Sequence, residues 1–357
     1  MAKTAKVAVI KTKPETVLKD YGKLMDLAEY KKYLPKNKEL IIKLNLSWSL
    51  YFPACSTEPW QLEGVLKKLV SDNYTKLHLV ENRTVVTDVW KGATGNKWLP
   101  VIKKYGQKYE PLTEVQWIKY KPKNDLGALN ELFPHDFKIP KMFLGKNILH
   151  LPTMKTHGHT IITGSMKNAF GGLITKRRHH SHKKIHKILV ELLQIQKEIH
   201  PGIFTVMDGT VCGDGAGPRT MMPKIKNYIL ASEDSVAIDA IAAKMMGFDP
   251  MKIPFIKIAH DKGLGIGDLG QIDIVGENIK NVNFHFKTRK SLVVFMDQTL
   301  RTKYPIFEPI LFHTPLFKLC ILGSAVYHDY FWYPLLGKLR INKFMKTEWG
   351  RLFQRYD

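Results

Sequence analysis

The chain has 357 residues, of which 44% are hydrophobic and 24% are charged. These values are typical of a folded globular protein and exclude a disordered, collagen-like or low-complexity chain. The 55 Lys and Arg exceed the 32 Asp and Glu by 23, which predicts attraction to nucleic acid, acidic lipid or a phosphorylated small molecule. Because the lysines are spread along the chain, nucleic acid is the less favoured partner, and a Lys-rich background composition explains the charge equally well.

Cysteine usage and the absence of long apolar runs bear on the compartment. Cys55, Cys212 and Cys320 are too few and too scattered for a disulfide framework, a cysteine zinc site or a four-thiolate iron–sulfur cluster. This usage fits a reducing compartment. The first fifteen residues contain no apolar core of a signal peptide, and no run of about 18 apolar residues occurs. We therefore expect a cytoplasmic protein, with peripheral binding at the inner membrane face as an alternative.

Short apolar runs alternate with segments of helical periodicity along most of the chain. The expected strands are Val7–Ile10, Leu40–Leu44, Leu77–Val80, Ile148–Leu151, Ile203–Met207, Tyr228–Leu230 and Ile272–Val275. The expected helices follow Pro59, cover Ile185–Ile199, and cover Val236–Met246 before Gly247. This alternation predicts an α/β fold with a mostly parallel sheet and helices on both faces.

The composition changes near residue 280, which divides the chain into two predicted regions. Residues 1–280 form the α/β domain, with a connection or insertion around 120–132, and residues 281–357 form an aromatic and basic C-terminal extension. In the extension, the apolar stretch Leu311–Leu322 and the aromatic cluster Tyr330–Tyr333 precede Lys338, Arg340, Lys343 and Lys346. This order is typical of an interfacial anchor on anionic lipid, but aromatic residues also suit packing on the core or a dimer interface.

Polar residues follow five of the expected strands, where open α/β sheets bind their ligands. Asn45 follows the second strand and Glu81 follows the third. The stretch after Leu151 contains Lys155, Thr156, His157 and His159, and it continues through Lys167 and Asn168 to Gly171 and Gly172. Lysines can hold a phosphate or carboxylate, a histidine can transfer protons near neutral pH, and glycines let the backbone approach a ligand. We therefore predict Lys155, His157 and Lys167 as catalytic residues, with the others binding ligand.

A second glycine-rich stretch runs from Asp208 to Arg219 and is interpreted as a loop. It matches neither nucleotide-binding fingerprint. The ligand-binding candidates in it are Asp208, Gly209, Asp214, Gly215 and Arg219. Asp208 and Asp214 could also ligate a hard cation, or they could cap turns. We predict that Lys155, His157, Lys167, Asp208 and Asp214 line one crevice.

The run Lys176–Lys184 contains five Lys and Arg residues and three histidines. Its cationic neighbours disfavour a metal site, so an anion-facing patch and a solvated charge run are the two interpretations left open. The helix Val236–Met246, including Asp239, is predicted to be structural, with Ser232 and Asp234 as helix caps.

Several of these stretches together resemble the domain-of-unknown-function family 362. The resemblance rests on six segments in order and spacing: Ala54–Pro59, Pro152–His157, Ser165–Gly172, Met207–Pro218, Ala231–Ala240 and Met246–Pro250. It covers about residues 40–276. Members of that family often carry ferredoxin-type iron–sulfur segments, which implies a redox or iron–sulfur partner. This chain lacks such a segment, so we expect no iron–sulfur cluster of its own, and the cofactor stays unknown.

The sequence thus favours an enzyme or a redox-associated accessory protein that binds an anionic small molecule in a Lys/His/Gly-lined cleft. The alternatives are a polyanion-binding module and a peripheral membrane protein without catalysis.

Overall fold

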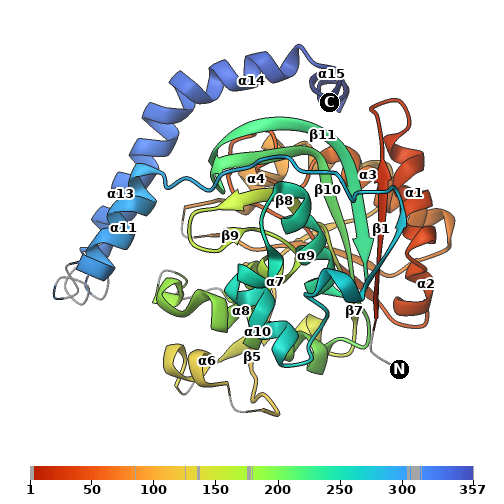
Figure 1. Ribbon diagram of the computed structural model, residues 1–357, viewed down its shortest axis with the longest axis horizontal. Helices are drawn as coiled ribbons and strands as arrows, with labels where there is room; N and C mark the ends of the chain where they lie inside the picture. Colours follow the sequence, from red (N-terminus) through yellow and green to blue (C-terminus); the bar gives the residue numbers. More distant parts are fainter. Residues whose placement is uncertain are drawn as a thin grey trace.

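A computed structural model describes residues 4–356, except 85, 125, 135–136, 175–177, 179, 304–305, 307–313 and 315. In this described part, ten strands belong to one sheet, whose main path has the order β12-β1-β11-β10-β7-β2-β3-β4 (Figure 1). The strands of that path are β1 (Ala5–Lys11), β2 (Leu40–Lys43), β3 (Leu77–Glu81), β4 (Tyr109–Pro111), β7 (Asn147–His150), β10 (Ile203–Ala216), β11 (Thr220–Ser232) and β12 (Ile272–Gly276). All neighbours pair in parallel except β1 with β11 and β10 with β11. The predicted α/β fold and its seven strands are confirmed.

Helices cover both faces of this sheet, because strand side chains alternate between two apolar layers. On β2, Leu40 and Ile42 point into one layer and Ile41 points into the other. The first layer holds α1 (Val17–Leu27), α3 (Pro59–Ser71), α4 (Val89–Gly95) and α5 (Trp98–Lys104). The second holds α6 (Gly127–Leu132), α7 (Ser165–Leu173), α8 (Ile185–Ile199), α9 (Ser235–Met246) and α10 (Pro254–Asp261).

Local signals set the boundaries of α9 as the sequence predicts. The Asp234 carboxylate accepts hydrogen bonds from the backbone N–H groups of Val236 and Ala237, which caps the first turn. The helix ends at Gly247, whose φ of +100° lies in the left-handed region that glycine adopts without steric cost. Asp239 in turn caps α7, since its carboxylate accepts from the backbone N–H of Ser165 at 2.6 Å and of Met166 at 3.1 Å.

The segment interpreted as a loop after Met207 and the stretch after Leu151 both contain strands. Residues 208–216 continue β10 and form a long hairpin with β11, and residues 153–157 form β8 (Thr153–His157), which pairs with β10 and with β9 (Ile161–Ile162). The glycines in the hairpin allow close packing. A Cβ at position 213 would lie 2.3 Å from the Met221 sulfur, and one at position 217 would lie 1.8 Å from the Thr156 carbonyl oxygen. The loop interpretation was wrong because the sequence does not distinguish a glycine in a loop from a glycine that allows close packing in a strand.

The stretch around residues 120–132 lies between the strands of a small antiparallel pair. These strands are β5 (Trp117–Lys119) and β6 (Lys138–Pro140), and α6 falls between them. The short helix α2 (Tyr30–Tyr33) follows α1.

The C-terminal extension is helical and returns to the core at its end. It comprises α11 (Leu292–Lys303), α13 (Phe317–Ala325), the π-helical segment Val326–Gly337, α14 (Lys338–Met345) and α15 (Glu348–Gln354). Phe353 stacks on Tyr51 with ring centroids 3.7 Å apart, and Trp349 packs against Trp60. In Figure 1 the blue helices arc around the sheet, with α11 and α13 furthest from it. Among the described helices, none is long and apolar enough to cross a membrane.

Candidate functional site

A pocket of about 600 Å³ lies beyond the carboxyl ends of β2, β3 and β8. The strand order explains its position. From β2 the chain passes through α3 to β3 on one side, and from β7 it passes through α7 and α8 to β10 on the other side. Crossovers that leave in opposite directions open a crevice between the two strands, and open α/β sheets bind ligands there.

A buried ion pair forms part of the pocket floor. Lys43, the last residue of β2, donates to the Glu81 carboxylate at 2.5 Å, and both side chains are almost completely buried. Burial lowers the pKa of Lys43 and raises that of Glu81, because it disfavours both charges. Gly171 and Gly172 of α7 provide the space for the lysine. A Cβ at Gly171 would lie 3.3 Å from Lys43 Nζ, and one at Gly172 would lie 3.4 Å from its Cε.

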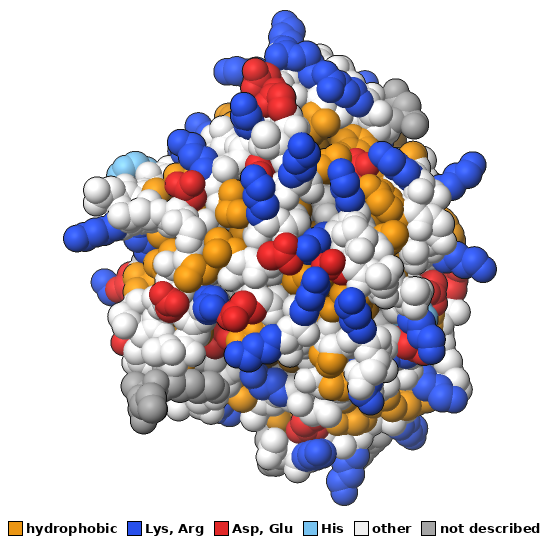
Figure 2. Space-filling model, turned by 90° about the vertical axis from the view of Figure 1, so that its right-hand side faces the viewer, with side chains coloured by type: hydrophobic (Ala, Val, Ile, Leu, Met, Phe, Trp, Pro, Cys, Tyr) orange, Lys and Arg blue, Asp and Glu red, His pale blue; other side chains and the backbone are white. Residues whose placement is uncertain are grey.

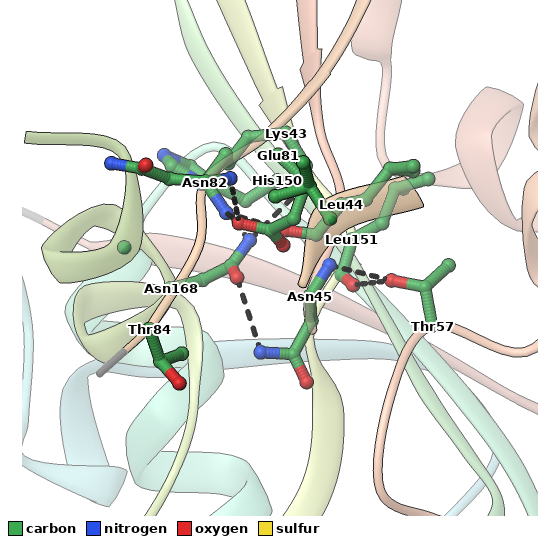
Figure 3. A network of polar contacts seen from close by, with 12 residues as sticks. Lys43, Leu44, Asn45, Thr57, Glu81, Asn82, Thr84, His150, Leu151 and Asn168 are labelled. Atoms are coloured by element: carbon green, nitrogen blue, oxygen red, sulfur yellow. Dashed lines mark hydrogen bonds and ion pairs between the residues drawn. The ribbon is translucent and has the colours of Figure 1, made fainter. Parts of the chain in front are cut away.

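The neighbouring Asn82 has a buried side-chain amide without a hydrogen-bonding partner in the described part of the chain. Its side chain is 1% exposed and lines the pocket, yet neither its oxygen nor its nitrogen has a hydrogen bond among the described residues. The same holds for Oε2 of Glu81. In Figure 3 the Asn82 side chain extends away from the network formed by the other labelled residues. Buried polar groups in native proteins are nearly always hydrogen-bonded, so these three atoms indicate a position for a ligand or water.

The polar groups on the other side of the floor are, by contrast, tied into a network (Figure 3). The Asn168 amide nitrogen donates to the carbonyl oxygen of Lys43 at 3.1 Å, and its oxygen accepts from Asn45 at 3.4 Å. Asn168 Nδ2 also lies 3.3 Å from Nδ1 of His150, whose Nε2 contacts Gln196 at 2.6 Å. Burial lowers the pKa of His150 to about 3, so the ring is neutral and accepts from Asn168. This network fixes the end of β2 and the face of α7 that meets the pocket.

Cations from α7 and the segment after it face this floor. Lys167 has no carboxylate partner among the described residues, and its ammonium lies 5.5 Å from the Phe170 ring centroid. Burial, together with Lys155 and Arg178, lowers the pKa of Lys167 to about 7. Arg178 is buried and donates to the carbonyl oxygens of Ile174 and Gly171. Glu81 is the sole acidic residue among the described residues that line the pocket, and it is paired with Lys43, so the remaining charge is positive.

Three histidines form a second polar side of the pocket. Burial, followed by the nearby cations, lowers the pKa of His157 well below its ordinary value, so the ring is neutral at pH 7. Its Nδ1 accepts from the backbone N–H of His159 at 3.1 Å, which places the proton of the neutral ring on Nε2. The His159 ring stacks on His182 with centroids 4.2 Å apart, and both line the pocket.

The opposite wall is apolar and comes from the C-terminal extension. It consists of Val293, Val294, Met296 and Leu300 of α11, with Phe317, Cys320, Ile321 and Tyr327 from the helix that begins at α13. The pocket therefore joins a cationic, hydrogen-bonding floor to an apolar wall.

The pocket brings together eight of the predicted site residues. They are Asn45, Glu81, His157, His159, Lys167, Asn168, Gly171 and Arg219. The prediction of one shared crevice holds for His157 and Lys167, and it is wrong for Lys155, Asp208 and Asp214, which do not line this pocket.

Lys155 does not line the pocket, but its ammonium contacts two residues that do, Asn45 and Ser47. Its ammonium donates to Asn45 Oδ1 at 2.6 Å, to Ser47 Oγ at 3.2 Å and to the carbonyl oxygen of Cys55 at 2.5 Å. These three acceptors use all three of its N–H groups. Lys155 therefore positions Asn45. Thr156 is similarly engaged, since its hydroxyl donates to the carbonyl oxygens of Gly213 and Gly215.

The two aspartates of the hairpin have protein partners of their own. Asp208 is fully buried and accepts from Tyr21, Trp60 and both the N–H and the hydroxyl of Thr210. Asp214 accepts from the backbone N–H of Lys287. Gly172, Gly209 and Gly215 are also outside the pocket lining, where they allow close packing or, at Gly215, a φ of +104°. No group of three or more His, Cys, Asp or Glu side chains suited to a metal ion occurs among the described residues.

The sequence interpretation missed Lys43 and Asn82. Lys43 lies inside the apolar run Leu40–Leu44, where a single lysine was treated as part of a strand. The available signal was a lysine in a strand that is apolar on both faces. Because an unpaired charge is rarely buried, such a lysine indicates a partner of opposite charge nearby. In the basic run, Arg178 and His182 line the pocket, whereas Lys176, Arg177 and His179 lie outside the described residues.

The fold and the pocket define the class: an α/β protein with a pocket at the switch point of a mostly parallel sheet. The chain belongs to the family described as "Domain of unknown function (DUF362)", whose model matches residues 40–244. It is similar to the thylakoid-associated protein sll1697 of Synechocystis sp. (strain ATCC 27184 / PCC 6803 / Kazusa), with 25% identity over 177 residues. The match covers 48% of this chain and 52% of that relative, so the chain spans about half of its length. No solved structure matches the chain.

Proposed function

We propose that the pocket binds an amphiphilic anion, with the charged head on the polar floor and the apolar part against α11 and α13. The observation that carries the proposal is the buried Asn82 side chain, whose Nδ2 donor has no partner among the described residues, beside the cations Lys167 and Arg178, which have no carboxylate partner there. A phosphate or carboxylate oxygen would accept from the Asn82 amide and the Lys167 ammonium. The apolar wall would exclude water from a bound alkyl or prenyl chain.

The same side chains can move protons on such a ligand. Because the pKa of Lys167 is near 7, its ammonium can release or take up a proton close to neutral pH. The neutral His157 ring presents an Nε2–H donor, which can hydrogen-bond a bound oxygen. We therefore propose Lys167 as the acid–base group and His157 as the group that orients the ligand. Lys155 supports the site by holding Asn45.

The chain is similar to a relative described as thylakoid-associated. This similarity supports a location of the protein at a membrane surface, where amphiphilic anions are found. The alternative of a polyanion-binding module is not supported by the face that Figure 2 shows. On the face shown in Figure 2, which includes the side of β1, α1 and α2, Lys and Arg alternate with acidic and apolar side chains. A polyanion-binding face would be continuous in charge.

Calorimetric titration with octyl phosphate below its micellar concentration tests the proposal. Inorganic phosphate and 1-octanol serve as the two half-ligands, and octanoate tests the other head group. We expect octyl phosphate or octanoate to bind at least about tenfold more tightly than either half-ligand. Equal or absent binding of both amphiphiles would contradict the proposal.

The variant Lys167→Met removes the charge but keeps the length of the side chain. We expect it to weaken binding of octyl phosphate by about tenfold or more. Lys187→Met, at an exposed position on α8, is the matched control and should bind like the parent protein.

A further inference from the structure

The extension contains a continuous helical rod with two different faces. It runs from Phe317 to Met345 through α13, the π-helical segment and α14. Its inner face is buried on the core: Trp332 packs against Trp48 and Phe52, and Phe344 lies 6.5 Å from Tyr51 between ring centroids. The packing of this face fixes which face of the rod points to solvent.

The outer face carries large apolar side chains that touch little of the protein. We call this set the exposed ridge: Leu319, Leu322, Tyr330, Phe331, Leu335, Leu336 and Leu339. The exposed fractions reach 62% at Leu319, 75% at Tyr330 and 66% at Leu339. Isolated apolar side chains on a surface are ordinary, but a row of seven along one rod is typical of an interaction surface.

The charges beside the ridge are of one sign. Lys318, Lys338 and Lys343 are exposed on the same rod, and Lys346 is exposed directly after its end. Between Leu316 and Thr347 the chain has a single acidic residue, Asp329, and its carboxylate accepts from the Trp48 indole N–H at 2.7 Å. Arg340 is directed to the core, where it donates to the carbonyl oxygen of Met221. The solvent side of the rod therefore combines apolar side chains with uncompensated lysines.

We infer that the exposed ridge docks on an anionic lipid bilayer. Leucine and aromatic side chains would enter the boundary between head groups and acyl chains, and the flanking lysines would lie among lipid phosphates and carboxylates. A second copy of this chain is a poorer occupant, because two ridges would bring two rows of lysines together. The inner side of the same rod supplies Ile321 and Tyr327 to the pocket wall, so the docked helix would separate the pocket from the bilayer. Docking does not depend on what the pocket binds.

Vesicle sedimentation of the full chain tests this inference. The vesicles contain phosphatidylcholine alone or with about 30 mol % phosphatidylserine, at low salt and at about 0.5 M NaCl. We expect binding to the phosphatidylserine vesicles that weakens at least several-fold in high salt or without the anionic lipid. A protein that stays in the supernatant at low salt, or binds both vesicles equally, would overturn the inference.

Matched variants separate the ridge from the total charge. The variant Leu322→Glu/Leu335→Glu/Leu339→Glu should lose binding by about tenfold or more, with unchanged thermal unfolding because the three positions are exposed. The control Leu144→Glu/Leu269→Glu/Ile274→Glu makes the same charge change at exposed apolar positions elsewhere and should bind like the parent protein. An equal loss of vesicle binding in both variants would show that binding depends on net charge and not on the exposed ridge. A parent protein that sediments as a dimer, with a monomeric ridge variant, would assign the ridge to a second copy instead.

Discussion

Two sets of buried polar residues in this protein differ in their hydrogen bonding, although each set contains a carboxylate. Outside the pocket lining, Asp208 and Lys155 have a protein partner for every strong hydrogen-bonding group. On the pocket floor, both atoms of the Asn82 amide and one oxygen of Glu81 have none among the described residues. Burial alone therefore does not distinguish a structural polar group from a ligand-binding one. What marks Asn82 and Glu81 is that their unsatisfied atoms also belong to residues lining the pocket, because a buried polar group without a partner is costly unless something else binds it.

The largest effect we predict is structural and concerns Asp208. Asp208→Ala would leave the donors of Tyr21, Trp60 and Thr210 without an acceptor in the core. We expect the free energy of unfolding to fall by about 3 kcal/mol or more, measured by chemical denaturation. Binding of octyl phosphate to the folded fraction should be unchanged. A decrease in the free energy of unfolding of less than about 1 kcal/mol would show that the hydrogen bonds to Asp208 do not stabilise the fold.

A second predicted effect is a pH dependence of anion binding that arises from Lys167. The pKa of its ammonium in the free protein is about 7, and an anion binds the protonated form. Affinity for octyl sulfate, whose own charge is constant, should therefore fall as pH rises above 7, by up to about tenfold per pH unit. The affinity should stop falling once the pH exceeds the pKa that Lys167 has in the complex. Titration at pH 6 to 9 measures the profile.

The variant Lys167→Arg is the control for this profile, because a guanidinium stays charged over the whole range. It should flatten the dependence. An equally steep profile in this variant would assign the titration to another group.

The smallest effect we predict concerns Gly171. A Cβ at this position would lie 3.3 Å from Lys43 Nζ and 3.6 Å from Glu81 Oε1, at the edge of the floor. Gly171→Ala should weaken probe binding several-fold, while stability changes by no more than about 1 kcal/mol, because alanine favours the helix. Gly22→Ala in α1 has only Lys68 Cδ nearby, at 3.6 Å, and should leave binding unchanged. Equal binding in both variants would place the ligand away from Gly171.

The sequence predicted elements well wherever periodicity determines structure. The strand predicted at Leu40–Leu44 was found because its run is almost continuously apolar, as in strands buried on both faces, and the helix Ile185–Ile199 was found because its apolar residues recur with the helical period. Contacts between distant segments were not predictable in the same way. Nothing in the sequence near Lys155 shows that three oxygens from residues 45, 47 and 55 accept hydrogen bonds from its ammonium. The apolar wall of the pocket escaped prediction for the same reason, since α11 and α13 lie more than a hundred residues after Lys167.

The most direct test of the account is the variant Asn82→Leu, measured for stability and for binding on the same preparation. Because the Asn82 side-chain amide has no hydrogen-bonding partner among the described residues, replacing it with an apolar side chain should leave the free energy of unfolding unchanged or raise it by about 1 kcal/mol. Binding of octyl phosphate should weaken by about tenfold or more. Asn96→Leu is the matched control: its amide donates to the carbonyl oxygen of Gly92 at 2.8 Å, so this variant should lose about 1 kcal/mol and bind normally. A destabilised Asn82→Leu protein with unchanged binding would contradict the account.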